Sequence, residues 1–248
     1  MDGLLRSRDR RVRILEAAPE LAEGVSDDEL MVAAAAVTAS EQRLSRGVWF
    51  PEREGRDVAL LVLDGLMVRS VDVEGSACAE LIGPGDVVRP WGCDADATVL
   101  PAVGWEVLDE VRLAVLDHRA LAAIGHWPAL VDALTARAVR RAHALAFQLA
   151  VSGLTRADLR LLTVLWNLAD RWGKVTPEGV ALPLQLTHRV LGRLVAVRRP
   201  SVTTHLGHLR ERGLVTQRRG RGWMLHGEPP AEVAEIRARL APLLAGQA

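Results

Sequence analysis

The sequence predicts an α+β chain in which an N-terminal β-roll is followed by a long helix and a mainly helical C-terminal domain. Between Gly47 and Leu116, short runs of Val and Leu alternate with Gly, Pro and Asp, which is typical of a barrel or a jelly-roll-like β-roll. Residues 128–152 contain no glycine and no proline after Pro128, which predicts one long helix. Residues 155–226 have the pattern of a helix, a short turn, a second helix and a hairpin.

The composition limits the class of protein. A chain of 248 residues, 49% of them hydrophobic, can form one large domain or two medium ones. The formal net charge is +0, so only the distribution of charge can indicate a nucleic-acid partner. Cys78 and Cys93 form no Cys-x-x-Cys pair, so we expect two small buried side chains in a reducing environment. With no signal peptide or membrane helix in the sequence pattern, a cytoplasmic location is expected.

The elements before residue 153 are predicted from caps and turns. A helix is expected after Ser26, with Ser26 as its N-cap and Glu29 completing a capping box. Asp64-Gly65 and Glu74-Gly75 are expected to form tight turns between paired strands. The long helix should pack against its own domain and against a second chain, since its apolar residues cover more than one face; the alternative is burial inside a monomer core. These residues are Leu130, Val131, Leu134, Ala138, Leu145 and Leu149.

The elements after residue 153 form the second part of the chain. Thr155 and Asp158 predict a capped helix that ends at Gly173. Residues 174–180 are expected to form a loop, and "VALPL" a short strand. A shorter helix should start at Thr187, the next helix should follow Arg198, and "LVTQ" and "WMLH" should form a hairpin joined by "RRGRG". This order is that of a winged helix-turn-helix, followed by a last helix from Pro229.

The two central helices have complementary apolar faces. In the first helix, five residues are expected to face inward, namely Leu186, Val190, Leu191, Leu194 and Val195. Ala196-Val197 should form the turn. In the second helix, Val202, Leu206 and Leu209 share one face. The opposite face is expected to carry the polar side chains Ser201, Thr204, His205 and His208, which can hydrogen-bond to base edges or phosphates.

Positive charge is concentrated around these helices. Between Thr187 and Gly222 there are nine arginines and one acidic residue, Glu211. Pro200 is expected at the first helical position, so Arg198 and Arg199 lie at the positive end of the helix dipole, where an anion would offset their repulsion. A phosphate or a guanine edge meets this requirement. A solvated basic loop is the alternative for the hairpin, but beside a two-helix motif we favour DNA.

The expected interface places the recognition helix, about residues 199–212, in a major groove and the wing, residues 217–225, on the DNA backbone. The candidate DNA-binding residues are Thr187, His188, Arg189, Arg198, Arg199, Ser201, Thr203, Thr204, His205, His208, Arg218, Arg219 and Arg221.

The segment "LTHRVLGRLVAVRRPSVTTHLGHLRERGLV" resembles the Crp/Fnr family of bacterial transcription regulators. The matching positions are Thr187, Leu191, Gly192, Arg199, Ser201, Val202 and the closing Gly213-Leu214-Val215. The N-terminal part, with Gly65 and the Gly83-Pro84-Gly85-Asp86 turn, is similar to the family's cyclic-nucleotide-binding-like sensor domain. The resemblance covers most of residues 40–226 and implies a homodimer on a palindromic double-stranded operator, with half-sites roughly 34 Å apart. RNA polymerase is a further partner that the family implies.

Two departures from the family pattern affect its implied functions. The family commonly has Glu and Arg in the recognition helix where this chain has Pro200 and Thr204, so the operator should differ. The sensor lacks the Gly-Glu pair and the Arg that hold a cyclic phosphate, and Asp94 and Asp96 would repel phosphate. We therefore expect no cyclic nucleotide. Arg89 and Trp91 are the candidate ligand-binding residues, and Trp91, Trp105 and Cys93 form either an apolar pocket or core.

Other functions fit the sequence less well. A signalling or ligand-binding module whose helix-turn-helix contacts protein is the alternative, and it predicts no salt-dependent DNA affinity. An enzyme is not expected, because no nucleophile triad, phosphate loop or metal-ligand spacing is present. No cofactor and no metal are expected: His205 and His208 could form half of a metal site without a third ligand, and no haem ligand is specified. The expected domains are residues 1–125 (roll), 126–153 (dimerisation helix), 154–228 (winged helix-turn-helix) and 229–248 (C-terminal helix).

Overall fold

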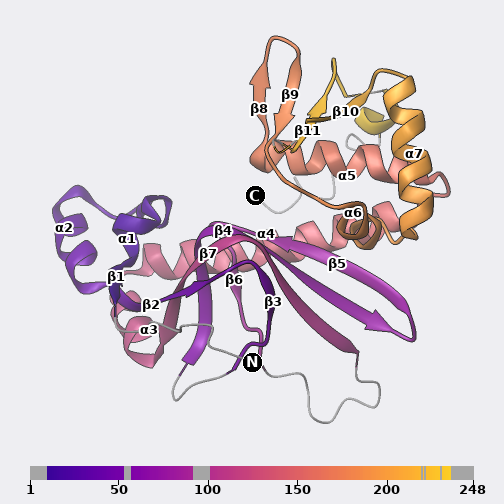
Figure 1. The fold of residues 1–248 in the computed structure, drawn as a ribbon. Coiled ribbons are helices and arrows are strands. Elements are labelled where there is room, and N and C mark those ends of the chain that lie inside the picture. The colour runs from indigo at the N-terminus through magenta and orange to yellow at the C-terminus, as the bar shows by residue number, and fades with distance from the viewer. Residues whose placement is uncertain are drawn as a thin grey trace. The chain divides into compact units, whose positions relative to one another are not determined.

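The computed structural model describes residues 10–52, 57–91, 101–218, 220, 222–229 and 231–235 (Figure 1). The chain divides into two compact units, residues 1–145 and 146–248. The mixed α+β architecture that the sequence predicts is confirmed. The division falls inside the long helix α4 (Pro128–Ser152), whose bounds agree with the prediction; the finer division into four domains stays a prediction.

An antiparallel sheet of seven strands forms the first unit. The strands are β1 (Arg11–Arg13), β2 (Thr38–Leu44), β3 (Gly47–Trp49), β4 (Asp57–Val73), β5 (Ser76–Ile82), β6 (Val87–Val88) and β7 (Ala102–Asp117). The order is β1-β2-β7-β4-β5, with β3 also paired to β7 and β6 to β4. Apolar side chains from these strands fill the described interior of the roll: Leu44, Trp49, Leu60, Val62, Met67, Ile82, Val88, Trp105, Val107, Val111, Leu113 and Val115.

The two predicted tight turns have different outcomes. Glu74-Gly75 joins β4 to β5 as a two-residue hairpin, since Val73 pairs with Ser76 and both turn residues have positive φ. The prediction of a turn at Asp64-Gly65 is wrong. There β4 continues through a bulge, and a Cβ on Gly65 would lie 2.0 Å from the carbonyl oxygen of Glu110. A glycine there permits the close approach of β7 instead of reversing the chain.

Short helices cover one part of the sheet in the first unit. They are α1 (Ile14–Ala17), the 3₁₀ turn η1 (Pro19–Ala22), α2 (Asp27–Ala36) and α3 (His118–Ile124). Ser26 is the N-cap of α2 as predicted, but its hydroxyl donates to Glu29 at 2.8 Å and makes no hydrogen bond to the backbone. Strand β2, which begins at Thr38, was not expected from the sequence.

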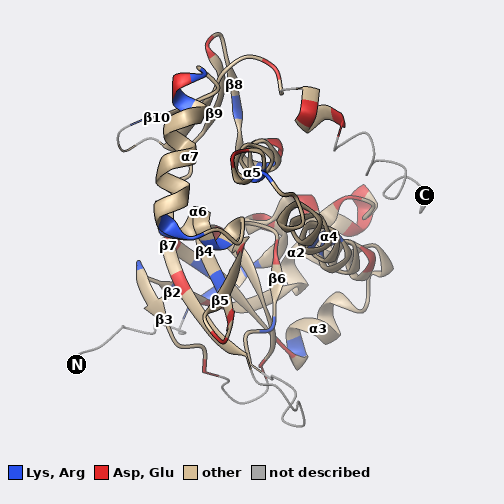
Figure 2. Cartoon of the chain, turned by 90° about the vertical axis from the view of Figure 1, so that its right-hand side faces the viewer, with Lys and Arg blue, Asp and Glu red and all other residues tan. Residues whose placement is uncertain are grey.

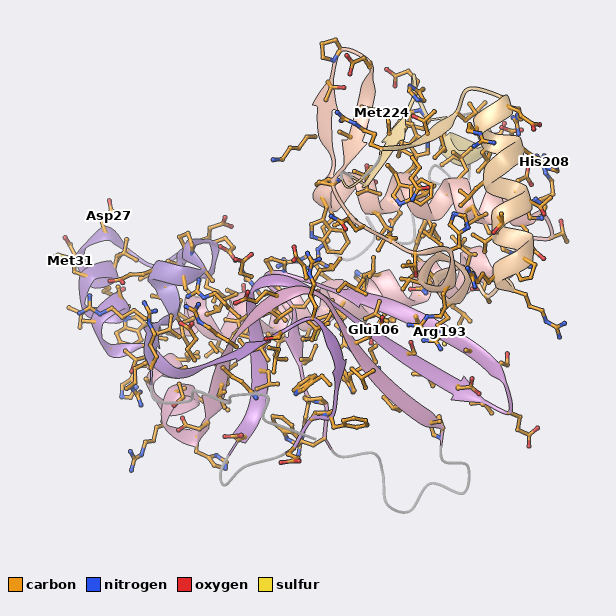
Figure 3. The ribbon with its side chains drawn as sticks, in the orientation of Figure 1. Asp27, Met31, Glu106, Arg193, His208 and Met224 are labelled. Carbon is orange, nitrogen blue, oxygen red and sulfur yellow. The ribbon has the colours of Figure 1, made fainter. Side chains whose placement is uncertain are left out.

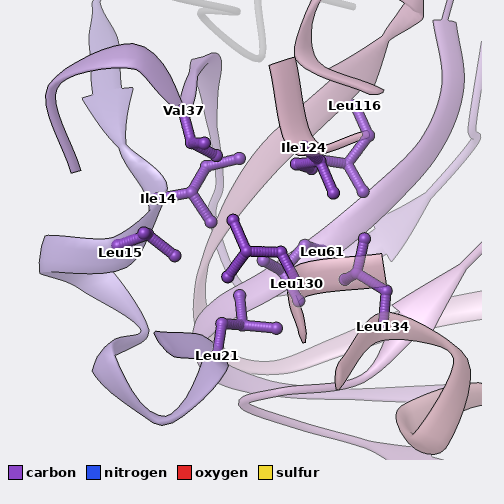
Figure 4. Close-up of a pocket in the computed structure, with 9 residues that line it drawn as sticks. All are labelled: Ile14, Leu15, Leu21, Val37, Leu61, Leu116, Ile124, Leu130 and Leu134. Atoms are coloured by element: carbon purple, nitrogen blue, oxygen red, sulfur yellow. The ribbon is translucent and has the colours of Figure 1, made fainter. Parts of the chain in front are cut away.

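A second apolar core lies between these helices, the sheet and the start of α4. It encloses a cavity of about 10 Å³, roughly the room of one water molecule, shown in Figure 4. The cavity is lined only by apolar side chains, namely Ile14, Leu15, Leu21, Val37, Leu61, Leu116, Ile124, Leu130 and Leu134. A space this small and apolar is a packing defect of the core.

The second unit holds the helix-turn-helix and a four-stranded antiparallel sheet. The elements are α5 (Ala157–Trp172), β8 (Lys174–Thr176), β9 (Gly179–Leu182), α6 (His188–Leu194), α7 (Arg199–Glu211), β10 (Val215–Arg218) and β11 (Gly222–Leu225), with residues 231–235 also helical. The sheet order is β10-β11-β9-β8. Most of residues 174–180 form the β8–β9 hairpin, so the predicted loop is wrong.

Two further predictions need correction. The N-cap of α5 is Arg156, not Thr155, and Arg156 pairs with Asp158 instead of a capping box forming. Cys78 is exposed and has a free thiol, because it lies near the tip of the β4–β5 hairpin, whereas Cys93 lies outside the described residues. Among the helices that the structure describes, none has the length and apolar character needed to span a membrane.

Candidate nucleic-acid interface

The α6–α7 crossing is built from a side-chain cap and a buried apolar face. Thr187 accepts a hydrogen bond from the Val190 amide at 3.2 Å and so begins α6. Ala196, with a φ of 52°, reverses the chain in the predicted turn. All eight residues expected to pack inward are buried, namely Leu186, Val190, Leu191, Leu194, Val195, Val202, Leu206 and Leu209. The apolar pattern of both helices is therefore confirmed.

Gly192 makes the close approach of the two helices possible. A Cβ at this position would lie 2.5 Å from the Val197 carbonyl oxygen and 3.4 Å from a methyl group of Val202. The Val197 amide also donates to the Gly192 carbonyl at 2.8 Å. Any larger side chain at residue 192 would push α7 away from α6.

Helix α7 begins with two exposed arginines. Arg198 is the N-cap, without a capping hydrogen bond, Arg199 is the first helical residue and Pro200 the second, one position later than predicted. All three are exposed. In Figure 2, basic residues mark both ends of α7. Two cations near a helix N-terminus repel the dipole unless an anion lies close by.

The outward face of α7 carries small polar side chains. Ser201, Thr204 and His208 are exposed, and Figure 3 shows His208 projecting from α7 away from the rest of its unit. Thr204 Oγ1 donates to the Pro200 carbonyl at 3.4 Å. His205 differs from the expected arrangement, because it is only partly exposed and its Nδ1 is buried without a hydrogen-bond partner in the described chain.

His205 lies at the inner margin of α7, near the start of α5. Its charge helps to lower the pKa of Asp158, although the hydrogen bond from Arg156 is the main cause of that lowering. Arg212, the C-cap of α7, lies 3.7 Å from the same carboxylate. This cluster links the start of α5 to the C-terminal half of α7. His205 and His208 are ring neighbours at 6.0 Å, and the described residues include no group of three metal-ligating side chains.

The β10–β11 hairpin is held to the start of α6. Gln185 Nε2 donates to the Gly220 carbonyl at 3.2 Å, and Trp223 packs its ring 6.3 Å from that of His188. Arg218 pairs with Gly222 at the last described rung of the hairpin. Arg219 and Arg221 lie outside the described residues. Sequence reasoning missed Gln185 and Trp223, and only their position beside a helix start and a hairpin tip could have indicated such a role.

Two other predicted DNA-binding residues already interact with other residues of the chain. His188 Nδ1 lies 2.9 Å from the Thr203 hydroxyl, so the structure brings these two candidates together across the helices. Arg189 is exposed and has a further interaction within the chain.

The two candidate ligand residues of the roll have different surroundings. Arg89 is exposed, whereas Trp91 is partly buried, packs against the core of the roll and has a buried, unpartnered Nε1. Trp105 is core, in an edge-to-face contact with Trp49 at 5.6 Å. Cys93, Asp94 and Asp96 lie outside the described residues.

One carboxylate links the roll to helix α4 within the first unit. Glu80 on β5, only 7% exposed, binds Arg69 of β4 at 3.0 Å and Arg141 of α4 at 2.6 Å. Arg141 also reaches the second oxygen of Glu80, from Nε at 3.1 Å. The arginine that α4 directs at this edge of the roll is therefore neutralised by the protein itself.

Comparison with known proteins agrees with this geometry. Residues 159–227 match the model of the Crp-like helix-turn-helix domain. A search of curated protein sequences finds no match. Among solved structures, a CooA mutant from Carboxydothermus hydrogenoformans has a TM-score of 0.62 at 15% identity, covering 90% of this chain and 94% of that one.

Two other solved structures have the same fold over slightly less of this chain. FixK2 from Bradyrhizobium japonicum has a TM-score of 0.59 at 18% identity, covering 80% of this chain and 96% of its own. The CRP/FNR family transcriptional regulator TTHA1359 from Thermus thermophilus has a TM-score of 0.56 at 23% identity, covering 80% and 98%. The resemblance predicted from the sequence is thus confirmed: residues 159–227 are a Crp-like helix-turn-helix domain, carried by a chain with the fold of the Crp/Fnr transcription regulators.

Proposed function

We propose that the protein is a homodimeric, sequence-specific DNA-binding transcription regulator that acts in the cytoplasm without a cyclic nucleotide. The observation that carries the proposal is the start of α7, where Arg198 and Arg199 are exposed at the helix N-terminus beside the α6 crossing. In this proposal α7 enters the major groove and the wing, residues 217–225, follows the backbone. Arg199 is the best candidate for a bidentate contact to a guanine, and RNA polymerase is the expected protein partner.

The polar surface of α7 supports a preference for a base sequence different from the one that a recognition helix rich in charged side chains would select. Ser201, Thr204 and His208 offer hydrogen-bond donors and acceptors without negative charge. Pro200 removes one backbone donor at the start of the helix. Base selection would therefore depend on Arg199 and a few neutral side chains, while the surrounding arginines supply sequence-independent attraction to phosphate.

Helix α4 supports the dimer. Val131, Thr135, Ala138, Ala142, Leu145 and Leu149 recur at alternating steps of four and three residues, and all six are exposed. Leu149 is 77% exposed, which is costly for a leucine in water. Alternation of this kind forms one seam along a helix, and two such seams pack as a coiled coil. A second copy of α4 is the natural occupant.

The interior of the roll supports independence from cyclic nucleotides. Large side chains, including Trp49 and Trp105, fill the described part of it. Arg141, a cation of α4 at the edge of the roll, is already paired with Glu80. A cyclic phosphate that paired with Arg141 would have to displace this internal carboxylate, which costs a buried ion pair.

The test is a titration of full-length protein with a duplex selected from a randomised pool and with an unrelated duplex, each at two salt concentrations. Arg199→Ala should weaken binding to the selected duplex by about 1–3 kcal/mol and change the unrelated duplex much less. Arg218→Ala should weaken both duplexes similarly and reduce the salt slope by about one. The assignment fails if the protein selects no duplex, or if its affinity does not depend on salt, as expected for a helix-turn-helix that contacts protein.

A further inference from the structure

A single hydrogen bond joins the first residue of α6 to the second turn of α7. His188 Nδ1 and Thr203 Oγ1 lie 2.9 Å apart although 15 residues separate them in sequence. The imidazole is partly buried, and its ring also packs near that of Trp223 on β11, with planes 33° apart. His188 therefore touches both the recognition helix and the wing.

The direction of this bond follows from the hydroxyl of Thr203. Thr203 Oγ1 also lies 3.3 Å from the Arg199 carbonyl oxygen, to which only the hydroxyl can donate. A hydroxyl has one hydrogen, so we assign Nδ1 of the imidazole as the donor of the other bond. The result is a relay from His188 through Thr203 to the backbone of Arg199.

Resting on the proposed function, we infer that His188 is a positioning residue for the recognition helix and does not contact phosphate. Its partner Thr203 belongs to the same relay and does not read bases. The relay ends on the residue that is best placed to recognise guanine, so it sets the orientation of the first turn of α7.

The apolar part of the α6–α7 contact is less directional than the hydrogen bond that orients the first turn of α7. Val202, Leu206 and Leu209 hold α7 by burial, which depends on area and has little directional preference. A hydrogen bond between side chains has a narrow range of distance and angle. The hydroxyl of Thr204 differs, because in the described chain it bonds to the Pro200 carbonyl within its own helix and does not cross to α6.

The experiment uses full-length protein, a duplex selected from a randomised pool by the wild-type protein, and an unrelated duplex. His188→Ala and Thr203→Val should each weaken the selected duplex about tenfold in the dimer, with the salt slope unchanged. The double variant should be no weaker than either single variant, because both break one relay. Thr203→Ser should retain affinity.

Two conservative variants separate positioning from other roles. Asn places its amide nitrogen near the position of Nδ1, whereas Gln places it near Nε2, so His188→Asn should restore affinity and His188→Gln should not. Thr176→Val serves as the control for loss of a hydroxyl, because Thr176 bonds to the Gly179 carbonyl within the β8–β9 hairpin, and it should leave the affinity for both duplexes unchanged.

Each other outcome contradicts the inference. A salt slope flatter by about one per site in His188→Ala would make His188 a phosphate contact. Additive losses in the double variant would mean that the two residues act separately. A lower thermal midpoint with unchanged affinity at low temperature would make the relay purely structural. A wild-type protein that selects no duplex would instead overturn the proposed function itself.

Discussion

Arg112 on β7 donates from Nε and Nη2 to the two carboxylate oxygens of Glu41 on β2, at 3.3 and 3.1 Å. Glu41 is 1% exposed, and Arg43 pairs with it from the same strand at 2.7 Å. These bonds, that of Arg112 first, lower the pKa of Glu41 below its ordinary value of 4.5, against the opposing effect of burial. The ion pair therefore makes the stability of the roll depend on pH.

We predict that the roll loses stability in acid through this carboxylate. Because the folded-state pKa is lower than the unfolded one, the contribution is fully present above the unfolded value of 4.5 and is lost as the pH falls through the folded value. Hydrogen exchange of peptides from β2 and β7 should accelerate in this window. Glu41→Gln should remove this part of the pH dependence. At neutral pH it should cost about 3 kcal/mol, the low end for a buried pair, because Arg112 and Arg43 are both partly exposed.

The control for this prediction is Glu23→Gln, an exposed carboxylate of the same unit. It should leave exchange in β2 and β7 unchanged at every pH. Identical acid profiles for wild type and Glu41→Gln would show that another carboxylate is responsible.

We predict that Gly192→Ala destabilises the helix-turn-helix. The new Cβ would lie 2.5 Å from a backbone oxygen, which cannot move as a flexible side chain can. Overpacking of this kind costs about 1–3 kcal/mol. Gly207→Ala in α7 is the matched control, since no atom lies within 4 Å of its Cβ and alanine favours a helix by up to about 1 kcal/mol.

Urea denaturation of the two variants measures the difference. The midpoint should fall for Gly192→Ala and stay or rise for Gly207→Ala. Equal midpoints would mean that α6 and α7 can separate without cost, which would contradict the importance of their close approach.

Helix periodicity and the glycines of the roll show what the sequence can and cannot predict. Periodicity places Val202, Leu206 and Leu209 on one face because that face depends only on helix geometry. It cannot distinguish the hairpin at Glu74-Gly75 from the bulge at Asp64-Gly65, because both need a positive φ. The difference lies in β7, whose Glu110 carbonyl passes Gly65 and is 45 residues away in sequence.

The candidate site shows a similar limit. Residue type indicated that His188, Thr203 and His205 could bind DNA, but it could not show which hydrogen bonds they already make. Thr203 bonds to His188 across two helices, and His205 is partly buried and interacts electrostatically with Asp158. Such partners depend on the crossing of α5, α6 and α7, which no local pattern specifies. The exposure of Arg198 and Arg199 at the start of α7 follows from the local pattern alone, whereas their contact with DNA stays a prediction.

We predict that Asp158→Asn changes DNA affinity more than stability. Asp158 lies 2.7 Å from Arg156 and 3.7 Å from Arg212, both about half exposed, and such pairs contribute at most about 1 kcal/mol. Removing the carboxylate makes the domain more positive, so binding to an unrelated duplex should strengthen and its salt dependence should steepen. Asp170→Asn on the exposed face of α5 removes the same charge and is the control. The difference in DNA affinity between the two variants measures the effect of the position of the charge at Asp158. A large loss of stability with unchanged affinity would contradict this expectation.

We predict that Leu149→Glu converts the protein to a monomer. Leu149 is 77% exposed in the α4 seam, and a pair of carboxylates across a two-fold axis would repel in an apolar interface. Sedimentation velocity should show the mass of one chain for this variant and of two chains for wild type. Val175→Glu is the matched control, because Val175 is 88% exposed on β8, outside the seam, and should leave the dimer intact. Affinity for the selected duplex should fall when dimerisation is lost. Each half-site would then be bound by a separate chain, without the effective concentration that the second recognition helix provides. A Leu149→Glu protein that still sediments as a dimer would place the interface elsewhere on the chain.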